Sequence, residues 1–337
     1  MSLYPVNDIM VSVCVVTYNH AKYIGNCLDH ILRQRRKFRI EILIHDDAST
    51  DGAQEVIRAY QKRYPDIIKP ILRVENQYSQ GITNISGAFN FPRAVGKYVA
   101  LTDGDDYWCD DYKLQRQVDY MEAHPECGFT FHSAKVVTED GALVNGELMR
   151  PYHESRVVKP VELVDKAIGS PFASFLLRRE IVEKLPDYYV DCPVGDRPLE
   201  LMAADYGDSY YFDEPMSVYR FGIRGSWTEN QMNGDYVEKQ QKYAADMWKM
   251  YHRFDAETGG RFHEACEHAG RRVEFLTAVN TRNFDLIYRA ENADFLQELS
   301  RHDRFFIDFE HRFPKLYHGL RCLKGGAPKQ LEEKENV

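Results

Sequence analysis

The length, composition and charge of the chain describe an ordinary globular protein and exclude several functions. Its 337 residues, 44% hydrophobic and 28% charged, can bury a sizeable core in one large domain or two smaller ones. The net charge of −9 argues against general nucleic-acid binding, which requires a basic surface. Seven scattered cysteines without a CxxC pair indicate reduced thiols. Because no secretory signal and no membrane-spanning run are evident, a soluble, cytoplasmic protein is expected.

Apolar periodicity alternates between strand and helix in the first part of the chain. Short β-branched runs such as MVSVCVV predict strands, whereas HAKYIGNCLDHILRQ has its apolar residues at helical spacing. Strands are predicted at 10–16, 40–46, 68–74 and 97–103, and helices at 20–34, 50–64 and 82–95. This alternation predicts an α/β fold with a mostly parallel sheet covered on both faces.

The pattern changes after residue 127. Two strands around a Glu-Asp-Gly turn are predicted first, followed by a surface excursion. The remaining predicted elements are a strand at 170–179, a helix at 195–207, a strand, turn and strand over 209–222, and helices from 226 to about 323. Residues 326–337 have the composition of a disordered tail.

Polar clusters follow three of the predicted strands. They are TYNH after the first strand, HDDASTDG after the second and TDGDDYW after the fourth. In parallel sheets, ligands bind beyond the carboxyl ends of the strands. The three clusters are therefore expected to converge on one edge of the sheet.

The stretch LTDGDDYWCDDY, residues 101–112, contains five aspartates beside aromatic residues. A calcium loop that starts at Asp103 is excluded, although Asp105 fits it. Tyr107, Trp108 and Leu114 stand where such a loop needs a ligand oxygen, a glycine and a glutamate.

Two interpretations of these aspartates remain open. An acidic turn that caps the next helix explains Asp110 or Asp111. It does not explain the crowding of Asp103, Asp105 and Asp106, because mutual repulsion raises their proton affinity unless a cation compensates. A site for Mg²⁺ or Mn²⁺ that carries a substrate diphosphate is the alternative.

The other two clusters also have structural interpretations. Asp47 and Ser49 suit a turn and a helix cap, and Asn19 suits the start of the first helix. A carboxylate at a strand end can instead accept the N–H of a base or the hydroxyl of a ribose. The residues alone leave both alternatives open.

Four stretches of the chain stand in a specific order and spacing. They are VSVCVVTYNHAKYIGNCLDHIL, IEILIHDDASTDGAQEVI, GKYVALTDGDDYWCDDYKLQRQVDYME and VGDRPLELMAADYGDSYYFDEPMSVYRFGIRGSW. Together they resemble the family-2 glycosyltransferases of the GT-A fold. The resemblance covers residues 10–227 and implies a Rossmann-like catalytic domain over 1–227, a helical region over 228–325 and a tail over 326–337. It also implies an inverting enzyme that uses a nucleotide-sugar donor and a divalent metal.

The resemblance carries over to individual residues of the strand-end clusters. It implies that the nucleotide is held by Thr17, Tyr18, Asn19, Asp46 and Asp47, with Asp47 the preferred partner of the base. The DxD-type motif falls on Asp103-Gly104-Asp105. Asp105 is implied to bind Mn²⁺ or Mg²⁺ on the diphosphate, and Asp103 to face the ribose or a metal-bound water. Asp106 is implied to orient the sugar or to support the residues that do.

Asp196, in VGDRPLE, matches the position of the base in that family. Its carboxylate would deprotonate the acceptor hydroxyl as this group attacks the anomeric carbon from the face opposite the leaving nucleotide. From the residues alone, a cap of the predicted 197–206 helix is the favoured interpretation. The resemblance favours the base.

Three side chains beside these motifs are further candidates. Arg220 and Arg224, in YRFGIRGSW, are candidate donors to phosphate oxygens. Trp108 is either a platform for the sugar or acceptor or a packing residue, whereas Tyr107 is expected to pack.

Other functions find less support in the sequence. HEACEH is not a metalloprotease motif, because His263 and His268 are five residues apart. A nucleotidyltransferase would need a glycine-rich basic loop after the first strand, where TYNHAKYIGN stands. A catalytically silent sugar-nucleotide-binding protein is the remaining alternative, and the presence of Asp105 and Asp196 argues against it.

The segment 301–324 mixes basic and aromatic residues. It either rests on an anionic bilayer at the inner membrane face or, as favoured, packs across the catalytic domain. Taken together, the sequence predicts the transfer of a sugar from a nucleotide diphosphate, preferably uridine-linked, to a hydroxyl. The expected acceptor is a growing glycan or a lipid-linked carrier in cell-surface polysaccharide synthesis.

Overall fold

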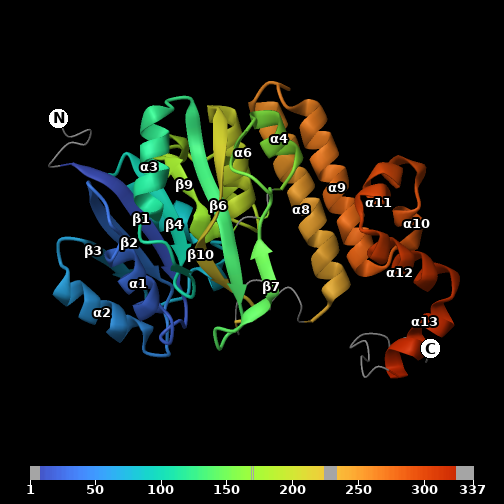
Figure 1. The fold of residues 1–337 in the computed structure, drawn as a ribbon, viewed down its shortest axis with the longest axis horizontal. Coiled ribbons are helices and arrows are strands. Elements are labelled where there is room, and N and C mark those ends of the chain that lie inside the picture. Colours follow the sequence, from blue (N-terminus) through green and yellow to red (C-terminus); the bar gives the residue numbers. More distant parts are fainter. Residues whose placement is uncertain (1–7, 168, 170, 224–233, 324–337) are drawn as a thin grey trace. The chain divides into compact units, whose positions relative to one another are not determined.

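The computed structural model describes residues 8–167, 169, 171–223 and 234–323 (Figure 1). The described residues form two compact units, one within 1–234 and 245–270 and the other within 235–244 and 271–337. Residues 245–270 thus fold with the first unit, and the division proposed at residue 227 remains a prediction. The tail predicted over 326–337 lies outside the described residues.

Ten strands of the described chain form one sheet, in the order β3-β2-β1-β4-β9-β6-β10-β5, with β7 beside β6 and β8 beside β10. The strands are β1 (Ile9–Thr17), β2 (Arg39–Asp46), β3 (Ile68–Leu72), β4 (Tyr98–Asp103), β5 (Tyr107–Trp108), β6 (Cys127–Val137), β7 (Leu143–Met149), β8 (Arg156–Val158), β9 (Leu176–Arg178) and β10 (Asp208–Arg220). The four strands β3, β2, β1 and β4 are parallel, as predicted. Beyond β4 the sheet is mixed, because β9 runs antiparallel to both of its neighbours.

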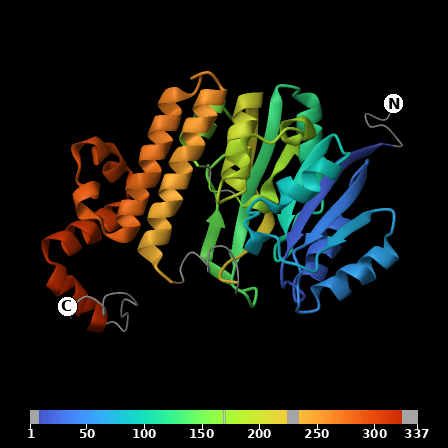
Figure 2. The same ribbon diagram turned by 180° about the vertical axis from the view of Figure 1, so that it is seen from behind.

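Helices cover both faces of the sheet. They are α1 (Ile24–Leu32), α2 (Ala53–Arg63), α3 (Lys113–Ala123), α4 (Pro160–Asp165), α5 (Asp187–Val190) and α6 (Asp196–Tyr206). The side chains of β1 alternate between the two faces of the sheet. On one face, Val11, Val13 and Val15 pack in one core with α1, α2 and α3. The alternate residues face the opposite side, where Ser12 Oγ accepts the N–H of Gly96 at 2.9 Å. Figure 2 views this opposite face.

Two predicted elements differ in the structure. The helix predicted over 82–95 is only a π-helical turn at Ser86–Asn90 and a 3₁₀ turn at Phe91–Arg93. Pro92 removes one helix donor, and a Cβ atom at Gly87 would lie 2.4 Å from the Tyr189 ring, so this segment follows its neighbours rather than helical periodicity. The strand, turn and strand predicted over 209–222 is one strand, β10, with an irregularity between Phe212 and Ser217.

Two other predictions have a clear outcome. The hairpin around Glu-Asp-Gly is confirmed, with the N–H of Thr138 bonded to the carbonyl of Ala142 at 2.8 Å between β6 and β7. Gly141 there has a φ of 88°, which favours glycine. The strand predicted over 170–179 is limited to β9, because a 3₁₀ turn occupies Phe172–Ser174.

The described residues after 234 are helical, as predicted. The helices are α8 (Tyr236–Glu257), α9 (His263–Thr281), α10 (Phe284–Ile287), α11 (Ala293–Glu298), α12 (Arg301–Arg312) and α13 (Pro314–Leu323). The second unit has its own small core around Phe275, Ile287 and Ile307. Within the part of the chain that the structure describes, no helix is both long and apolar enough to cross a membrane.

Candidate active site

The ends of three parallel strands meet at one edge of the sheet. Thr17 pairs in register with Asp46, and Val16 pairs with Asp103. The loops that follow β1, β2 and β4 therefore start side by side. The polar clusters of the sequence converge here, as the strand-end rule predicts.

Asp46 organises the turn that follows β2. Its carboxylate is fully buried and accepts hydrogen bonds from the Ser49 N–H at 3.0 Å, the Ser49 hydroxyl at 2.5 Å and Gln54 Nε2 at 2.7 Å. A buried carboxylate with three donors is fully satisfied within the protein. Asp46 therefore shapes the turn around the predicted nucleotide site.

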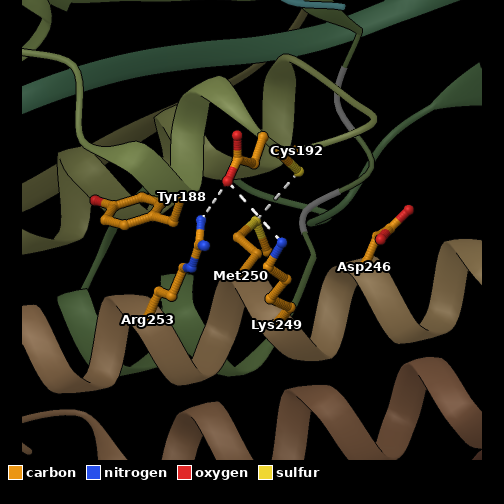
Figure 3. Close-up of a pocket in the computed structure, with 7 residues that line it drawn as sticks. Tyr188, Cys192, Asp246, Lys249, Met250 and Arg253 are labelled. Atoms are coloured by element: carbon orange, nitrogen blue, oxygen red, sulfur yellow. Dashed lines mark hydrogen bonds and ion pairs between the residues drawn. The ribbon is translucent and has the colours of Figure 1, made fainter.

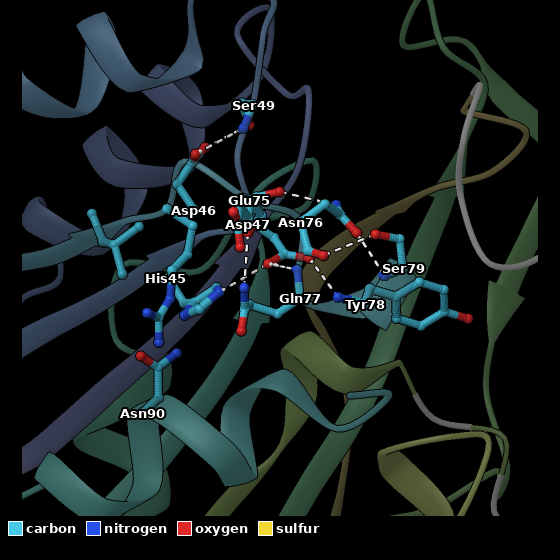
Figure 4. Close-up of polar contacts among 12 residues, drawn as sticks. His45, Asp46, Asp47, Ser49, Glu75, Asn76, Gln77, Tyr78, Ser79 and Asn90 are labelled. Atoms are coloured by element: carbon cyan, nitrogen blue, oxygen red, sulfur yellow. Dashed lines mark hydrogen bonds and ion pairs between the residues drawn. The ribbon is translucent and has the colours of Figure 1, made fainter. Parts of the chain in front are cut away.

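Asp47 joins this turn to the loop that follows β3. Its carboxylate accepts the N–H of Gln77 at 2.8 Å and of Tyr78 at 3.0 Å, and His45 Nε2 lies 3.3 Å away. Figure 4 shows the Asp47 side chain directed toward these three residues. Only Oδ1 has two of these partners, so Oδ2 keeps capacity for one further donor. A contact with a base remains a prediction for Asp47.

The loop after β1 is tied to the same turn. Asn19, with a φ of 56°, donates its backbone N–H to Ser49 Oγ at 2.8 Å, and its side-chain Oδ1 accepts the N–H of Thr50 at 2.8 Å. Asn19 does not cap α1, whose N-cap residue is Tyr23. Tyr18 is 43% exposed and open to a ligand, whereas the buried Oγ1 of Thr17 has no hydrogen-bond partner among the described residues.

The second acidic turn, after β4, carries Asp103, Asp105 and Asp106. A Cβ atom at Gly104 would lie 2.6 Å from Thr17 Oγ1, so glycine is needed where this turn packs on β1. His20 Nε2 lies 3.7 Å from Asp105 Oδ2. Among the described residues, no cation other than that histidine forms an ion pair with these three carboxylates.

Burial and repulsion dominate the electrostatics of this turn. Burial raises the pKa of Asp103 to about 8, and the charges of Asp105 and Asp196 add to the effect. Burial, Asp105 and Asp103 likewise raise the pKa of Asp106 well above its ordinary value. The turn is thus arranged for a positive partner that the surrounding side chains do not supply.

Arg220, at the end of β10, supports this turn from the side. Its backbone N–H bonds Asp106 Oδ1 at 3.0 Å, and its Nε bonds the carbonyl of Asp105 at 2.8 Å. The guanidinium lies over the rings of Tyr23 and Tyr107, 5.0 and 5.1 Å from their centroids. Arg220 therefore positions the acidic turn, and a contact of its guanidinium with phosphate remains a prediction. Arg224 lies outside the described residues.

Asp196 is the first residue of α6. The N-cap residue is Gly195, and no side chain makes a capping bond, so the structure does not support the helix-cap interpretation of Asp196. Its Oδ1 accepts the N–H of Arg197 at 2.8 Å, and burial raises its pKa. Its charge contributes to the raised pKa of Asp103, after burial and Asp105, so the two carboxylates are near enough to interact electrostatically.

Arg197 anchors the start of α6. Its buried guanidinium donates to the hydroxyl of Tyr251 at 2.8 Å, to the carbonyl of Leu163 at 2.7 Å and to the carboxylate of Glu200. These contacts reach α4 and the part of α8 within the first unit. They fix the backbone that carries Asp196.

The segment before Asp196 has two further anchors. Asn84 Nδ2 bonds the carbonyl of Cys192 at 3.1 Å, while Asn84 Oδ1 is buried without a partner. On the other side, Asp191 pairs with Arg253 at 2.5 Å, and the Cys192 sulfur lies 3.5 Å from the Met250 sulfur. Figure 3 shows Met250 and Arg253 on α8, with Met250 directed toward Cys192.

The two aromatic residues after the acidic turn have different surroundings, and the packing alternative holds for Trp108. Trp108 is fully buried among core residues and its Nε1 donates to the carbonyl of Ala173 at 2.9 Å. A sugar or acceptor platform at Trp108 is therefore wrong, because its ring is closed to ligands. Tyr107, expected to pack, is partly exposed and touches Arg220. Successive residues of β5 point to opposite faces, which explains why Trp108 is buried and Tyr107 is partly exposed.

Asp110 and Asp111 lie just outside the predicted helix start. Helix α3 begins at Lys113, and Asp110 Oδ1 accepts the N–H of Tyr112 at 2.7 Å in the turn before it. Asp111 pairs with Arg33 at 2.8 Å. Both aspartates are therefore structural, and neither belongs to the acidic turn that faces Asp196.

Three residues of the site were not identified from the sequence. His20 was quoted within TYNH without a role, although a basic residue next to a strand-end cluster is a usable signal. Asn84 and Arg197 had no signal, because their partners, Cys192 and Tyr251, are distant in the sequence.

The donor set fits a hard divalent cation in part. Within the described residues, no three His, Cys, Asp or Glu side chains are arranged to hold a metal ion by themselves. Mg²⁺ and Mn²⁺ need only one or two carboxylates when a substrate diphosphate supplies further oxygens. The repulsion that raises the pKa of Asp103 and Asp106 is what such an ion relieves. Asp105, with Asp103, fits as its protein ligand.

The histidines of HEACEH and the cysteines, to which the sequence analysis gave no catalytic role, have structural surroundings. His263 pairs with Asp255 and His268 with Asp165, so the two histidines do not share a metal site. Six of the seven cysteines are free thiols, namely Cys14, Cys27, Cys109, Cys127, Cys192 and Cys266.

Comparisons with known proteins identify the family of the chain. The model described as Glycosyl transferase family 2 matches residues 12–186, just over half of the chain. An uncharacterized protein of Mycobacterium tuberculosis is 34% identical over 225 residues, which cover 64% of this chain and 60% of that protein. TuaG of Bacillus subtilis, named a putative teichuronic acid biosynthesis glycosyltransferase, is 33% identical over 132 residues, 39% of this chain and 49% of its own length. The chain thus spans less than two thirds of these relatives.

Solved structures resemble the fold at low sequence identity. TarS of S. aureus, residues 1–349 in complex with UDP-GlcNAc, aligns with a TM-score of 0.58 and 16% identity over 96% of this chain and 93% of that one. The mannosyltransferase PcManGT of Pyrobaculum calidifontis, in complex with GDP-Man and Mn²⁺, aligns with a TM-score of 0.51 and 18% identity over 97% of this chain and 92% of that one. The chain has the GT-A fold, with the mixed sheet described above, and it belongs to glycosyl transferase family 2.

Proposed function

We propose that the chain is a metal-dependent, inverting glycosyltransferase. It takes a sugar from a nucleotide-diphosphate donor, uridine-linked, and transfers it to a hydroxyl of a glycan or lipid-linked acceptor in cell-surface polysaccharide synthesis. The observation that carries the proposal is the acidic turn after β4, where burial and the charges of Asp105 and Asp196 raise the pKa of Asp103.

Asp196 is the base in this proposal. Its raised pKa means a higher proton affinity, which suits a carboxylate that must take the proton of a hydroxyl. As the proton passes to Asp196, the acceptor oxygen forms a bond to the anomeric carbon. The bond between that carbon and the diphosphate oxygen breaks, and its electron pair leaves with the nucleoside diphosphate. Attack from the opposite face inverts the configuration.

The loops after β1, β2 and β3 hold the nucleotide in this proposal. The exposed ring of Tyr18 is the accessible contact, and the buried Oγ1 of Thr17 and Oδ2 of Asp47 have hydrogen-bonding capacity left among the described residues. Asn19 and Asp46 contribute by fixing the two loops to each other. The base therefore meets a preformed surface rather than flexible loops.

The diphosphate lies over the acidic turn in this proposal. Asp105, with Asp103, would hold Mn²⁺ or Mg²⁺, which when bound neutralises the negative charge that builds on the leaving group. Asp106 keeps the turn in place through Arg220, and the terminal nitrogens of Arg220 would donate to phosphate oxygens. Support for a divalent metal comes from the Mn²⁺ in the PcManGT complex.

The preference for uridine and for a cell-surface acceptor rests on the relatives. TarS was solved with UDP-GlcNAc, and TuaG is named for teichuronic acid biosynthesis. PcManGT was solved with GDP-Man, so a guanosine donor is the direct competitor. A panel of UDP- and GDP-linked sugars separates the two.

The test is release of free nucleotide from these donors in the presence of Mn²⁺ and acceptor extracts. Asp196→Asn should lower kcat by about 10²- to 10⁴-fold, the range for a general base, while the Kd for UDP stays unchanged. Asp187→Asn, an exposed acid on α5, is the matched control and should keep full activity. Donor binding without any release would instead support a silent binding protein.

A further inference from the structure

The second unit exposes an aromatic ridge along α12 and α13. Phe305 is 61% exposed and Phe313 is 54% exposed. Phe309 lies between them, its ring centroid 6.0 Å from Phe305 and 5.8 Å from Phe313. We define the aromatic ridge as Phe305, Phe306, Phe309, Phe313, Leu316 and Leu320. Large apolar side chains that contact one another at the surface mark an interaction site more clearly than scattered ones.

Basic residues flank this ridge. Arg301 and Arg312 lie on the helix face of Phe305, four residues before it and seven after it. Arg304 lies on α12 and Lys315 lies on α13. Among the described residues, the structure gives these four cations no carboxylate within ion-pair distance. Their charge is therefore available to a partner.

The acidic residues of α12 are already engaged. Glu310 is 6% exposed and pairs with Arg282 at 3.0 Å. The hydroxyl of Tyr288 donates to Asp308, and the hydroxyl of Ser300 donates to the carboxylate of Asp303. These two carboxylates keep their charge, but the four cations outnumber them, so the net charge around the ridge is positive on a chain whose net charge is −9.

We propose that the aromatic ridge docks on the surface of an anionic lipid bilayer. Aromatic and aliphatic side chains enter the headgroup boundary, while Arg and Lys beside them contact lipid phosphates. A chain with this net negative charge needs such a local basic surface to approach an anionic membrane. A second copy of the chain fits less well, because a symmetric contact would bring the unpaired cations of the two copies together. The inference goes beyond the proposed function and does not depend on it.

The experiment is co-sedimentation of the full chain with vesicles of phosphatidylcholine alone or with phosphatidylglycerol. Binding is expected only to the anionic vesicles and should weaken with salt. Phe305→Ser with Phe313→Ser should reduce it at least tenfold, whereas Val95→Ser with Val161→Ser, 61% and 59% exposed in the first unit, should leave it unchanged. Nucleotide release should be unaffected in both double variants.

A charge pair of variants completes the design. Arg301→Glu with Arg312→Glu should abolish binding to anionic vesicles, whereas Lys62→Glu with Arg63→Glu on α2, an equal change in net charge, should lower it less than twofold. Equal pelleting of all variants would overturn the proposal. A second outcome would also overturn it: the native chain does not bind vesicles but forms an oligomer, and the Phe305→Ser, Phe313→Ser variant is monomeric. The ridge would then be an interface between two copies of the chain.

Discussion

Two acidic turns of similar sequence lie at the same edge of the sheet and are built in opposite ways. In the turn after β2, Asp46 accepts three hydrogen bonds and Asp47 accepts the N–H groups of the loop after β3. In the turn after β4, no described residue gives Asp103 or Asp105 comparable donors, and burial and repulsion raise the pKa of Asp103 to about 8. The same residue type thus has its hydrogen bonds within the protein in one turn and lacks such donors among the described residues in the other.

This difference separates residues that support the site from residues that contact the substrate. A satisfied buried carboxylate stabilises the fold, and its loss leaves buried donors unpaired. A crowded and unpaired carboxylate costs stability, which is acceptable where binding compensates for it. Substitutions in the two turns should therefore affect different measurements.

The largest expected effect is on turnover when Asp105 is changed to asparagine. Several kcal/mol of transition-state stabilisation come from a metal ion on the leaving group, so kcat should fall at least about a hundredfold. The free energy of unfolding should not fall, because the charge of Asp105 raises the pKa of both Asp103 and Asp106. Nucleotide release and chemical denaturation measure the two quantities.

The next effect, Asp46→Ala, should appear in stability instead. The Ser49 N–H, the Ser49 hydroxyl and Gln54 Nε2 would lose their acceptor, which should lower the free energy of unfolding by about 2 to 4 kcal/mol. Glu55→Ala, in the first turn of α2, is the control and should change it little. A variant at Asp46 that unfolds like the native chain but releases no nucleotide would reverse the assignment of the two turns.

The sequence predicts these turns but not the difference between them. HDDAS and TDGDD both follow apolar runs, and the strand-end rule correctly places them together. The loop after β3 adds to this difference, because the backbone N–H groups of Gln77 and Tyr78 donate to the carboxylate of Asp47. Because every residue except proline has a backbone N–H, the sequence does not show which of these groups will donate to a given carboxylate.

Long-range packing explains the other differences from prediction. Gly87 lies against Tyr189, which replaces a predicted helix by short turns. Trp108 is buried because the two-residue strand β5 pairs with β10, more than a hundred residues away in sequence. By contrast, α1, α2 and α6 follow local periodicity and were predicted closely. The assignment of Asp196 as base stays a prediction that the structure makes more specific through Arg197.

A moderate effect is expected when ligand is added to the native chain. Mn²⁺ together with UDP should raise the free energy of unfolding by about 2.7 kcal/mol at a hundredfold excess over Kd. Asp105→Asn should lose most of this gain, whereas Asp110→Asn, in the structural turn before α3, should keep it. Thermal unfolding at several ligand concentrations provides the measurement. An equal gain in free energy of unfolding for the Asp105→Asn variant would mean that the metal does not bind at the acidic turn.

The smallest expected effect concerns Lys113 and the dependence of stability on pH. It tests whether a buried charged group without an ion-pair partner among the described residues stays charged when no ligand can reach it. Lys113 is fully buried, with the neutral Gln117 as its hydrogen-bond partner at 2.9 Å and the Trp108 ring 4.2 Å from its Nζ. Burial lowers its pKa well below the ordinary value. Unlike Asp105, it is closed to any ligand, so it should lose its proton on folding.

This proton loss has a defined pH dependence. Between the lowered pKa of Lys113 in the folded chain and the unfolded pKa of lysine, about 10.4, the unfolded chain binds one more proton than the folded chain. In that range Lys113 makes stability rise with pH by at most about 1.4 kcal/mol per unit. Lys113→Met removes that contribution, and its advantage over the native chain should be largest at low pH and disappear near pH 10. Lys62→Met, at an exposed lysine of α2, should leave the slope unchanged. Parallel curves for Lys113→Met and the native chain would mean that Lys113 keeps its proton, and that a buried charge in this fold can persist with only Gln117 and the Trp108 ring as partners.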